Sequence, residues 1–436
     1  MKTNWIIFLL LFSQIALAQE KSLTLAECIQ YAFLHNLQSV KQEAQNEIYK
    51  IDQREAIGGF LPSVSAGTSI YMNFGRGVDP ETNNYISNNT FSNAYEIYSS
   101  LVLFDGLSQV YRTKLSKINR LKGKEELQNI KDKMAFDVME IFFNVLYYKG
   151  TAELAQQQLG ESSNNLKKFQ RMEELGLKSI PDLNEIQAKE AEDRFVLTKQ
   201  INLYNLEIIK LKTKMNMPPE EDLQIAGYTD LLPVGKTQES AFAVYQQALS
   251  SLPKIQAAGK SLSATEMEYK IAKGRLFPTL SLGAGFSTGF SRMMDGSAYM
   301  SFSEQLKTKE GTYVNLSLSV PLFDRFSRSS EMKRSRQRLV IARSEHEETL
   351  RQAYSEIEQI VADVNGLSDE FRFAQKRTEA MQTAHQANLR KYEEGLISAI
   401  ELTTSSNRLL NSRVEELYTN LKYQLKYRLL EYYRGN

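Results

Sequence analysis

Residues 134–150 read MAFDVMEIFFNVLYYKG, and residues 350–366 read LRQAYSEIEQIVADVNG. In both stretches apolar side chains recur at alternating intervals of four and three residues, and each stretch ends on a glycine. Every matched position is separated by 216 residues. This spacing is typical of a coiled-coil seam rather than of the broader apolar stripe of a helix on a globular core. The sequence therefore predicts two coiled-coil helices related by an internal repeat.

The repeat extends over most of the chain. Three further pairs of segments match at offsets of 216 or 219 residues: LPSVS with FPTLS (61–65 and 277–281), LFD with LFD (103–105 and 322–324), and GL with GL (176–177 and 395–396). Each half therefore has the same predicted order of elements: helix, strand, strand, long helix, glycine turn and helix. Prolines and polar residues interrupt the helical pattern between the halves.

The predicted organisation is a signal peptide followed by two structural repeats. We place the signal peptide at 1–18, the first repeat at 19–217, a linker at 218–235 and the second repeat at 236–436. We expect strands at about 63–75, 95–104, 279–290 and 313–322, and helical hairpins at about 107–216 and 326–433. The hairpins are expected to turn near residues 176 and 395.

The hairpin helices are expected to be unusually long. No proline occurs between Pro80 and Pro181, or after Pro321, so no residue there forces a helix to break. A continuous helix over residues 107–175 would extend roughly 100 Å at 1.5 Å per residue. That length is typical of a structure that crosses a compartment, and three glycines inside the stretch are candidate bends.

The predicted strands alternate between apolar and small polar side chains. The alternation is regular in the first, third and fourth strands, whereas residues 95–104 alternate poorly and are assigned by their match to the fourth strand. Such segments have the length and period of membrane strands with one lipid face and one wet face. A half-buried soluble sheet alternates in the same way and remains an alternative. The polar linkers at 75–93 and 292–311 are typical of loops outside a cell and favour the membrane interpretation.

The first residues indicate export from the cytoplasm. Lys2 supplies a positive charge, residues 5–12 are apolar, and residues 16–18 (ALA) have the small-residue pattern of a cleavage site. After this site no stretch approaches the ~20 apolar residues of a transmembrane helix. The single cysteine, Cys28, has no partner for an intrachain disulfide and is expected to pack in the core.

Composition and motifs argue against several classes of function. The chain has 53 Lys and Arg against 52 Asp and Glu, so no net field favours nucleic acid. There is no Gly-rich phosphate loop and no nucleophile elbow. The three histidines, His35, His346 and His385, lie in helical stretches without metal-ligand spacing, and we interpret them as solvated helix surface. We therefore expect no enzymatic activity, no metal and no cofactor.

The duplicated halves, the LPS and FPT strand entries, the LFD strand exits and the Gly-Leu turns together resemble the TolC family of outer-membrane efflux and secretion channels. The resemblance implies an α+β membrane protein made mainly of long helices. A homotrimer would combine three sets of four strands into one twelve-stranded barrel in the outer membrane of a Gram-negative bacterium. A coiled-coil α-barrel would continue it through the periplasm. Four strands alone are incomplete, because open strand edges are not tolerated in hydrocarbon.

The two glycine turns are the first candidate site. The resemblance implies that they form a periplasmic tip that docks the hairpin of an adaptor protein. The residues concerned are Leu175, Gly176, Leu177, Ser179, Gly395, Leu396 and Ser398. Glycine permits positive φ, and the leucines offer an exposed apolar contact. The alternative is a plain helix C-cap with its usual hydrophobic contact, and the two interpretations are compatible.

Carboxylates just past each tip are the second candidate site. Members of the resembled family can close the resting tube with acidic residues near the second tip. Glu401 lies at the first position of that pattern and Thr404 at the second, so half of it is missing, while Asp182 and Glu185 keep the spacing in the first hairpin. These carboxylates are candidates for a cation-binding gate ring. Alternatively, Ser398 and Glu401 form a capping box, which the first hairpin nearly copies.

The function implied by the resemblance is passive conduction. An inner-membrane transporter and a periplasmic adaptor would supply energy and selectivity. This chain would supply a wet path across the periplasm and outer membrane, opened by untwisting of the tip helices. Two other interpretations remain: a secreted coiled-coil scaffold without a pore, and a periplasmic adaptor, which usually carries one hairpin rather than a duplicated plan.

Overall fold

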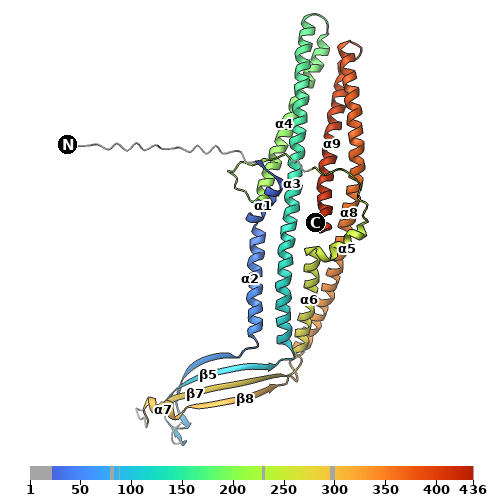
Figure 1. The fold of residues 1–436 in the computed structure, drawn as a ribbon. Helices are drawn as coiled ribbons and strands as arrows, with labels where there is room; N and C mark the ends of the chain where they lie inside the picture. The colour runs from blue at the N-terminus through green and yellow to red at the C-terminus, as the bar shows by residue number, and fades with distance from the viewer. Residues whose placement is uncertain (1–21, 79–82, 88, 228–230, 295–299, 436) are drawn as a thin grey trace, which may run out of the picture. The chain divides into compact units, whose positions relative to one another are not determined.

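The computed structural model describes residues 22–78, 83–87, 89–227, 231–294 and 300–435 (Figure 1). The expected signal peptide at 1–18 lies outside the described residues. The first half of the chain contains α1 (Leu25–His35), α2 (Leu37–Gly58), β2 (Ser63–Asn73), β5 (Thr90–Phe104), α3 (Ser108–Glu174) and α4 (Ile180–Met215). The second half contains α5 (Ala241–Ser251), α6 (Pro253–Gly274), β7 (Thr279–Met293), β8 (Gly311–Ser319), α8 (Ser327–Glu393) and α9 (Ala399–Tyr433).

The internal repeat is visible in the lengths of the helices. Corresponding helices have 11 and 11, 22 and 22, 67 and 67, and 36 and 35 residues. α3 stays helical through Gly123, Gly150 and Gly160, so none of the candidate glycines ends it. Among the described residues, no helix combines the length and the apolar composition needed to cross a membrane.

The linkers between the predicted strands contain short elements that the sequence did not predict. In the first linker, β3 (Arg76–Val78) pairs antiparallel with β4 (Tyr85–Ser87). The second linker contains α7 (Phe302–Thr308), which begins with a capping box. A short parallel pair also joins β1 (Ser22–Leu23) to β6 (Gln224–Ile225). The interpretation of these linkers as plain polar loops is therefore wrong, because local pairing and capping order parts of them.

The chain forms two compact units, and each contains segments of both repeats. The first unit comprises residues 1–40, 128–252 and 352–436, and the second comprises residues 41–127 and 253–351. The compact units therefore do not coincide with the two sequence repeats. The first unit holds both hairpin tips, and the second holds the four-stranded sheet.

The core of the first unit is built on the predicted coiled-coil seams. Met134 and Val138 of the first seam are buried, as are Ile357 and Val364 of the second. Cys28 packs with the first pair and has the core position expected from the sequence. Burial raises the pKa of its thiol to about 12, and the charge of Glu27 adds to the shift. Full burial of one such apolar side chain stabilises the fold by roughly 1.5–3 kcal/mol.

The repeated LFD motif has a capping role in the second unit. The Asp105 carboxylate accepts a hydrogen bond from the backbone N–H of Gln109 at 2.9 Å. The Asp324 carboxylate accepts the equivalent bond from the N–H of Arg328, also at 2.9 Å. Each aspartate thereby satisfies one of the free N–H groups at the start of a long helix.

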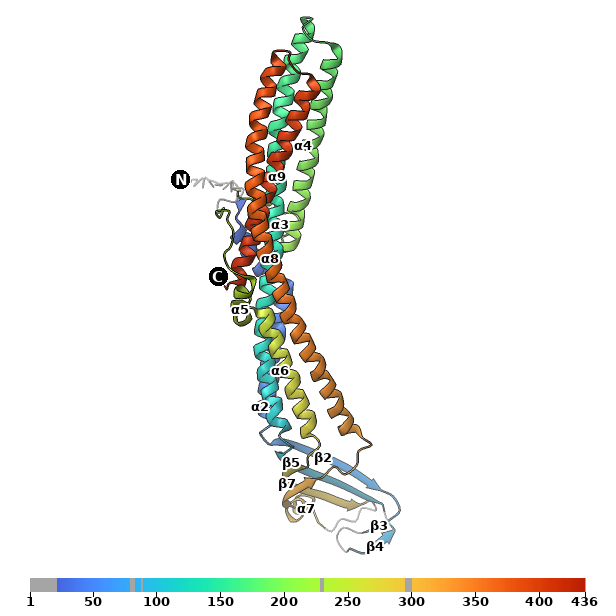
Figure 2. The same cartoon turned by 90° about the vertical axis from the view of Figure 1, so that its right-hand side faces the viewer.

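The sheet of the second unit has four antiparallel strands in the order β2-β5-β7-β8 (Figure 2). β5 begins at Thr90, earlier than predicted, because it pairs with β2 and β7 over most of its length. β8 ends at Ser319, before the predicted limit. β2 and β8 are the two edge strands of this sheet.

The register places apolar side chains on one face of the sheet. Ile97 lies between Ala66 and Phe286 on this face, and Leu282 pairs with Leu316. The opposite face carries mainly Ser, Gly and Asn. The apolar face is open to its surroundings; its most exposed members are Val64 (70%), Ile70 (61%), Val314 (76%) and Leu316 (64%). A half-buried soluble sheet requires such a face to be covered, and in this unit it is not.

Candidate functional site

Both hairpins reverse the chain with the same backbone turn. Gly176 and Gly395, which follow α3 and α8, adopt φ of +73° and +78°. The next residue donates its N–H to the carbonyl five residues earlier, at 2.9 Å for Leu177 and 2.8 Å for Leu396. These bonds form a Schellman cap, in which any side chain at the glycine would strain the turn. Each tip is therefore a glycine C-cap, one of the two interpretations of the sequence.

The leucines of the tips lack the hydrophobic contact that usually accompanies this cap. Leu175 and Leu177 are 68% and 66% exposed, and Leu396 is 67% exposed. Ile180 and Ile400, on the helices that follow, are 64% and 62% exposed. Each tip therefore presents a small apolar patch, which suits contact with another protein.

Serines begin the two return helices. Ser179 Oγ accepts a hydrogen bond from the N–H of Asp182 at 3.3 Å, and Ser398 Oγ accepts one from the N–H of Glu401 at 3.3 Å. Ser179 also donates its hydroxyl to the Asp182 carboxylate at 2.7 Å. The expected capping box of the second hairpin is only half formed, since no hydrogen bond between described residues joins the Glu401 carboxylate to Ser398. The Glu401 carboxylate is instead exposed on α9.

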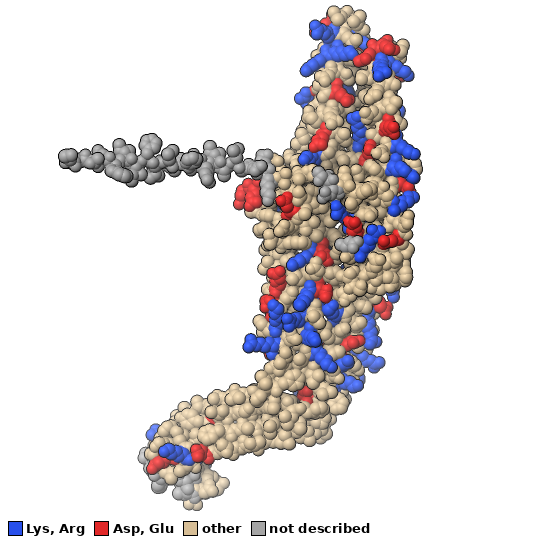
Figure 3. Space-filling model, in the orientation of Figure 1, with Lys and Arg blue, Asp and Glu red and all other residues tan. Residues whose placement is uncertain are grey.

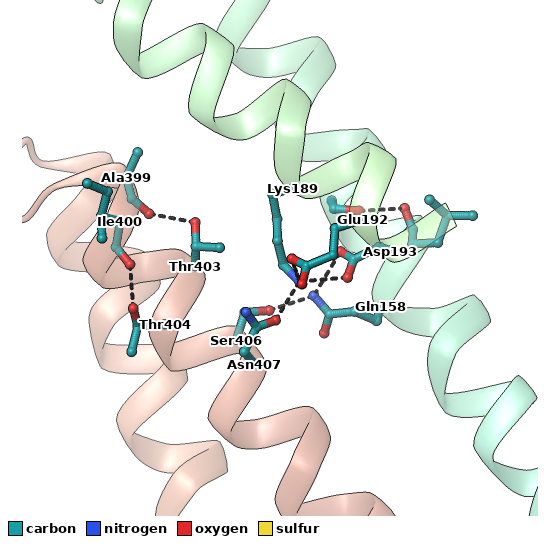
Figure 4. Close-up of polar contacts among 12 residues, drawn as sticks. Gln158, Lys189, Glu192, Asp193, Ala399, Ile400, Thr403, Thr404, Ser406 and Asn407 are labelled. Atoms are coloured by element: carbon teal, nitrogen blue, oxygen red, sulfur yellow. Dashed lines mark hydrogen bonds and ion pairs between the residues drawn. The ribbon is translucent and has the colours of Figure 1, made fainter. Parts of the chain in front are cut away.

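The remaining predicted gate positions are divided between two helices. Glu185 lies one turn after Asp182 on α4 and is partly buried. On α9, Thr404 donates its hydroxyl to the carbonyl of Ile400 at 2.8 Å (Figure 4). Within one chain the candidate carboxylates therefore lie on α4 and α9, and the threonine hydroxyl is occupied inside its own helix.

An aromatic stack joins the two hairpins near their tips. The rings of Phe169 on α3 and Tyr392 on α8 stack with their centroids 4.9 Å apart. The Lys178 ammonium lies 4.7 Å from the centroid of the Tyr392 ring. Ile186 from α4 and Leu402 from α9 belong to the same buried cluster. The two tips are therefore packed on a shared core.

A buried polar cluster, which the sequence did not predict, links three of the hairpin helices (Figure 4). Lys189 and Asp193 on α4 are 7% and 2% exposed and form an ion pair of 2.6 Å. The Lys189 ammonium also donates to the side-chain oxygen of Asn407 on α9. Gln158 on α3 donates to Ser406 Oγ on α9 at 2.6 Å and to Asp193 at 3.4 Å. The cluster thus ties α3, α4 and α9 together.

The local sequence contains no sign of this burial. Opposite charges at positions i and i+4 are typical of an exposed helix surface. Glu190 and Arg194, one residue further along α4, have this spacing, and the Arg194 side chain is exposed. Packing against α3 and α9, rather than spacing, sets Lys189 apart from its neighbour.

A cavity of about 30 Å³ adjoins the cluster, and His385 on α8 lines it. In the part of the chain that the structure describes, the buried Nδ1 of His385 has no hydrogen-bond partner. Burial lowers the pKa of His385; Glu161 opposes this shift and Arg413 adds to it. The interpretation of all three histidines as solvated surface is therefore wrong for His385, and His346 is also partly buried, whereas His35 is exposed.

Breaking the buried ion pair is expected to destabilise the hairpins strongly. Lys189→Met leaves the Asp193 carboxylate buried without its cation, which in comparable pairs costs about 3–5 kcal/mol. Adding Asp193→Leu removes the second charge and is expected to recover most of the loss. Melting followed by circular dichroism measures both variants. The exposed pair is the control, because Glu190→Gln with Arg194→Gln should change the free energy of unfolding by less than about 1 kcal/mol. A Lys189→Met protein as stable as this control contradicts the assignment.

Comparisons with known proteins agree with this architecture. The family model described as "Outer membrane efflux protein" matches residues 244–435. The "Pyoverdine export outer membrane protein OpmQ" of Pseudomonas aeruginosa is 25% identical over 159 residues. That stretch covers 36% of this chain and 31% of OpmQ, so it spans less than a third of the relative.

Solved structures extend the likeness over nearly the whole chain. CusC, whose structures concern folding and transmembrane channel formation, superimposes with a TM-score of 0.82 at 16% identity, covering 94% of this chain and 92% of CusC. The outer membrane protein VceC of Vibrio cholerae has a TM-score of 0.81 at 12% identity, with coverages of 94% and 96%. At these identities the likeness is one of fold. With a family match in its second half and this fold over both halves, the chain belongs to the outer membrane efflux protein family, the TolC-like channels.

Proposed function

We propose that the chain is the outer-membrane channel component of a multi-part efflux pump or type I secretion system. It conducts substrates passively to the cell exterior, after an inner-membrane transporter and a periplasmic adaptor have delivered them. The observation that carries the proposal is a four-stranded sheet with an exposed apolar face and two edge strands. OpmQ, a relative in sequence, is named for pyoverdine export, which supports an export role.

The exposed apolar face suits hydrocarbon, but the strand edges do not. In a bilayer each unpaired backbone N–H or C=O costs several kcal/mol. Four strands are also fewer than the eight or more of known membrane barrels. Copies of the chain must therefore complete one another, and the family resemblance sets the number at three, for a homotrimer with twelve strands. A soluble scaffold has no comparable need for this face.

The internal repeat supplies a pairing between copies. Within the chain, the second strand of the first repeat, β5, pairs with the first strand of the second repeat, β7. Continued outward, the same relation pairs β8 with β2 of the next copy. At the repeat offsets of 219 and 216, the observed pair Tyr98–Gly285 becomes Ser317 opposite Ser69 of the next copy.

The turns that follow β5 and β8 support the same arrangement. Gly106, with φ of +69°, packs so closely on the backbone of Gly274 at the end of α6 that no Cβ fits. The matching turn after β8 has Arg325, with φ of +55°. The matching glycine at the end of α2 is Gly58, where an added Cβ meets no atom within 4 Å. The second turn and the second glycine would therefore meet between copies, with room for the Arg325 side chain.

Cysteine cross-linking tests this register. In a Cys28→Ala background, Ser317→Cys with Ser69→Cys is expected to join copies by a disulfide and to convert the monomer into a covalent trimer on a non-reducing gel. The matched control, Ser317→Cys with Thr68→Cys, places the second thiol on the opposite face, because side chains alternate along a strand. Equal cross-linking of both pairs contradicts the register. A protein that stays monomeric in detergent and leaves planar bilayers silent contradicts the channel itself.

The hairpin tips are the proposed docking surface for the adaptor. The residues are Leu175, Gly176, Leu177, Ser179, Gly395, Leu396 and Ser398. Two features support this role: the exposed leucines stand on capped turns, and the shared aromatic core holds those turns in place. Because both tips use the same turn, one type of partner hairpin suits either.

Charge at the tips is expected to block docking without closing the channel. Gly176→Asp with Gly395→Asp adds a carboxylate and strains the positive-φ turns, so we expect loss of export and of adaptor co-purification, with conductance in planar bilayers retained. Gly160→Asp is the control, since Gly160 is an exposed helical glycine with open space around it. Normal export by the double tip variant would place docking elsewhere.

Glu401, together with Asp182 and Glu185, is the proposed gate. The Glu401 carboxylate supports this role because the helix cap uses its N–H and leaves its side chain exposed. Copies arranged around an axis would bring three such carboxylates together as a ring that binds cations.

Neutralising the ring is expected to ease conduction. Glu401→Gln should raise single-channel conductance or relieve block by divalent cations, because it removes charge from the axis. Ser398→Ala is the matched control: it removes the cap at a cost of about 1 kcal/mol while keeping the carboxylate. If the two variants behave alike in planar bilayers, Glu401 acts only through the helix end.

A further inference from the structure

The second unit carries a local concentration of positive charge beside its sheet. The start of α3 (108–117), the end of α6 (270–275) and the start of α8 (325–336) together contain eleven Lys or Arg and one acid, Glu331. Figure 3 shows Lys and Arg gathered on the helices of this unit, while most of the sheet surface is free of charge. We call the three segments the cationic belt. The near neutrality of the whole chain conceals it.

Much of this charge has no carboxylate partner. Glu331 is taken by Arg334 and Arg338, and Arg328 pairs with Asp324 at 3.5 Å. Four other cations of the belt are exposed and take part in none of the ion pairs between described residues: Lys117, Lys273, Lys333 and Arg336. The belt therefore presents free positive charge to whatever surrounds it.

Helix stability does not account for the belt. A helix dipole favours acidic residues in the first turn, and neither α3 nor α8 has one there. Further along the same helices the balance reverses. Residues 125–174 contain six Lys or Arg against nine Asp or Glu, and residues 344–393 contain six against ten. The positive charge is confined to the part of each helix next to the sheet.

The belt adjoins the exposed apolar surface. α3 begins four residues after β5 ends, and α6 ends five residues before β7 begins. Exposed apolar side chains occupy the junctions, among them Phe277, Leu322 and Phe326. Ten helical residues rise roughly 15 Å, about the depth of one headgroup layer plus one Debye length. The order from sheet to helix is thus apolar, aromatic and cationic, as at a membrane interface.

We propose that the cationic belt binds the phosphate groups of anionic phospholipids in the leaflet from which the helices emerge. The inference rests on the proposed membrane position of the sheet. Lys and Arg near a negatively charged leaflet are attracted to it, and Arg binds phosphate through two hydrogen bonds. With cations at headgroup level and apolar strands in hydrocarbon, the belt sets the depth of the sheet in the bilayer.

Lipid selectivity in reconstituted vesicles tests the proposal. Electron paramagnetic resonance of spin-labelled lipids compares binding of phosphatidylglycerol with phosphatidylcholine by the full-length protein. We expect a preference of about threefold or more for phosphatidylglycerol at low salt, which falls as salt is added. The belt variant changes Lys117, Lys273, Lys333 and Arg336 to Gln and is expected to lose the preference.

The matched control removes the same number and type of exposed cations from the first unit. Lys167, Lys199, Lys376 and Arg408 are changed to Gln, and the preference is expected to persist. Equal binding of both lipids by the unmodified protein, or equal loss in the control, overturns the proposal. Full competition by inorganic phosphate also overturns it, because the site would then be one for free phosphate.

Single-channel conductance in the same vesicles separates this result from the proposed function. A protein that conducts without lipid preference leaves the channel intact and removes the lipid site. An unmodified protein that binds phosphatidylglycerol but never conducts removes the channel instead. Circular dichroism and the trimer band on a gel check that the belt variant is folded.

Discussion

The molecule depends on backbone hydrogen bonds that one copy cannot complete. β2 and β8 are edge strands of a sheet whose apolar face is exposed. In water such a sheet is prone to aggregate, and in hydrocarbon every unpaired N–H and C=O costs several kcal/mol. The duplication offers a solution, because the pairing of β5 with β7 can continue from β8 to β2 of another copy. The proposed pore, the ring of carboxylates and the lipid contact of the cationic belt all require that closure.

Because the chain is duplicated, positions where the halves differ are informative. The same turn follows both inner strands, yet Gly106 meets a backbone of its own chain and Arg325 does not. The same serine cap begins both return helices, yet Asp182 is bound by Ser179 while the Glu401 carboxylate is left free. In each case the fold keeps the backbone geometry in both halves and releases one side chain from a structural role, so that it is available to a sister copy or an ion.

The buried polar cluster is best explained by specificity. Buried ion pairs seldom stabilise a fold more than apolar side chains of similar size do, because desolvation offsets their attraction. A polar residue inside a coiled coil does, however, select one register and disfavour others. Lys189, held between Asp193 on α4 and Asn407 on α9, makes contacts that a shifted helix would break. We interpret the cluster as the feature that aligns the two hairpins and so keeps both tips on their shared core.

The sequence by itself determined the repeat, the order of helices and strands, the coiled-coil seams and the glycine turns, because each follows from local periodicity or from the backbone freedom of glycine. It did not determine the start of β5 at Thr90, where alternation is irregular and the partners β2 and β7 set the length of the strand. Nor did it separate Lys189 from the exposed neighbouring pair, or His385 from exposed His35. Polar residues with the same local spacing look alike in sequence, and only the packing of distant helices decides which of them is removed from water.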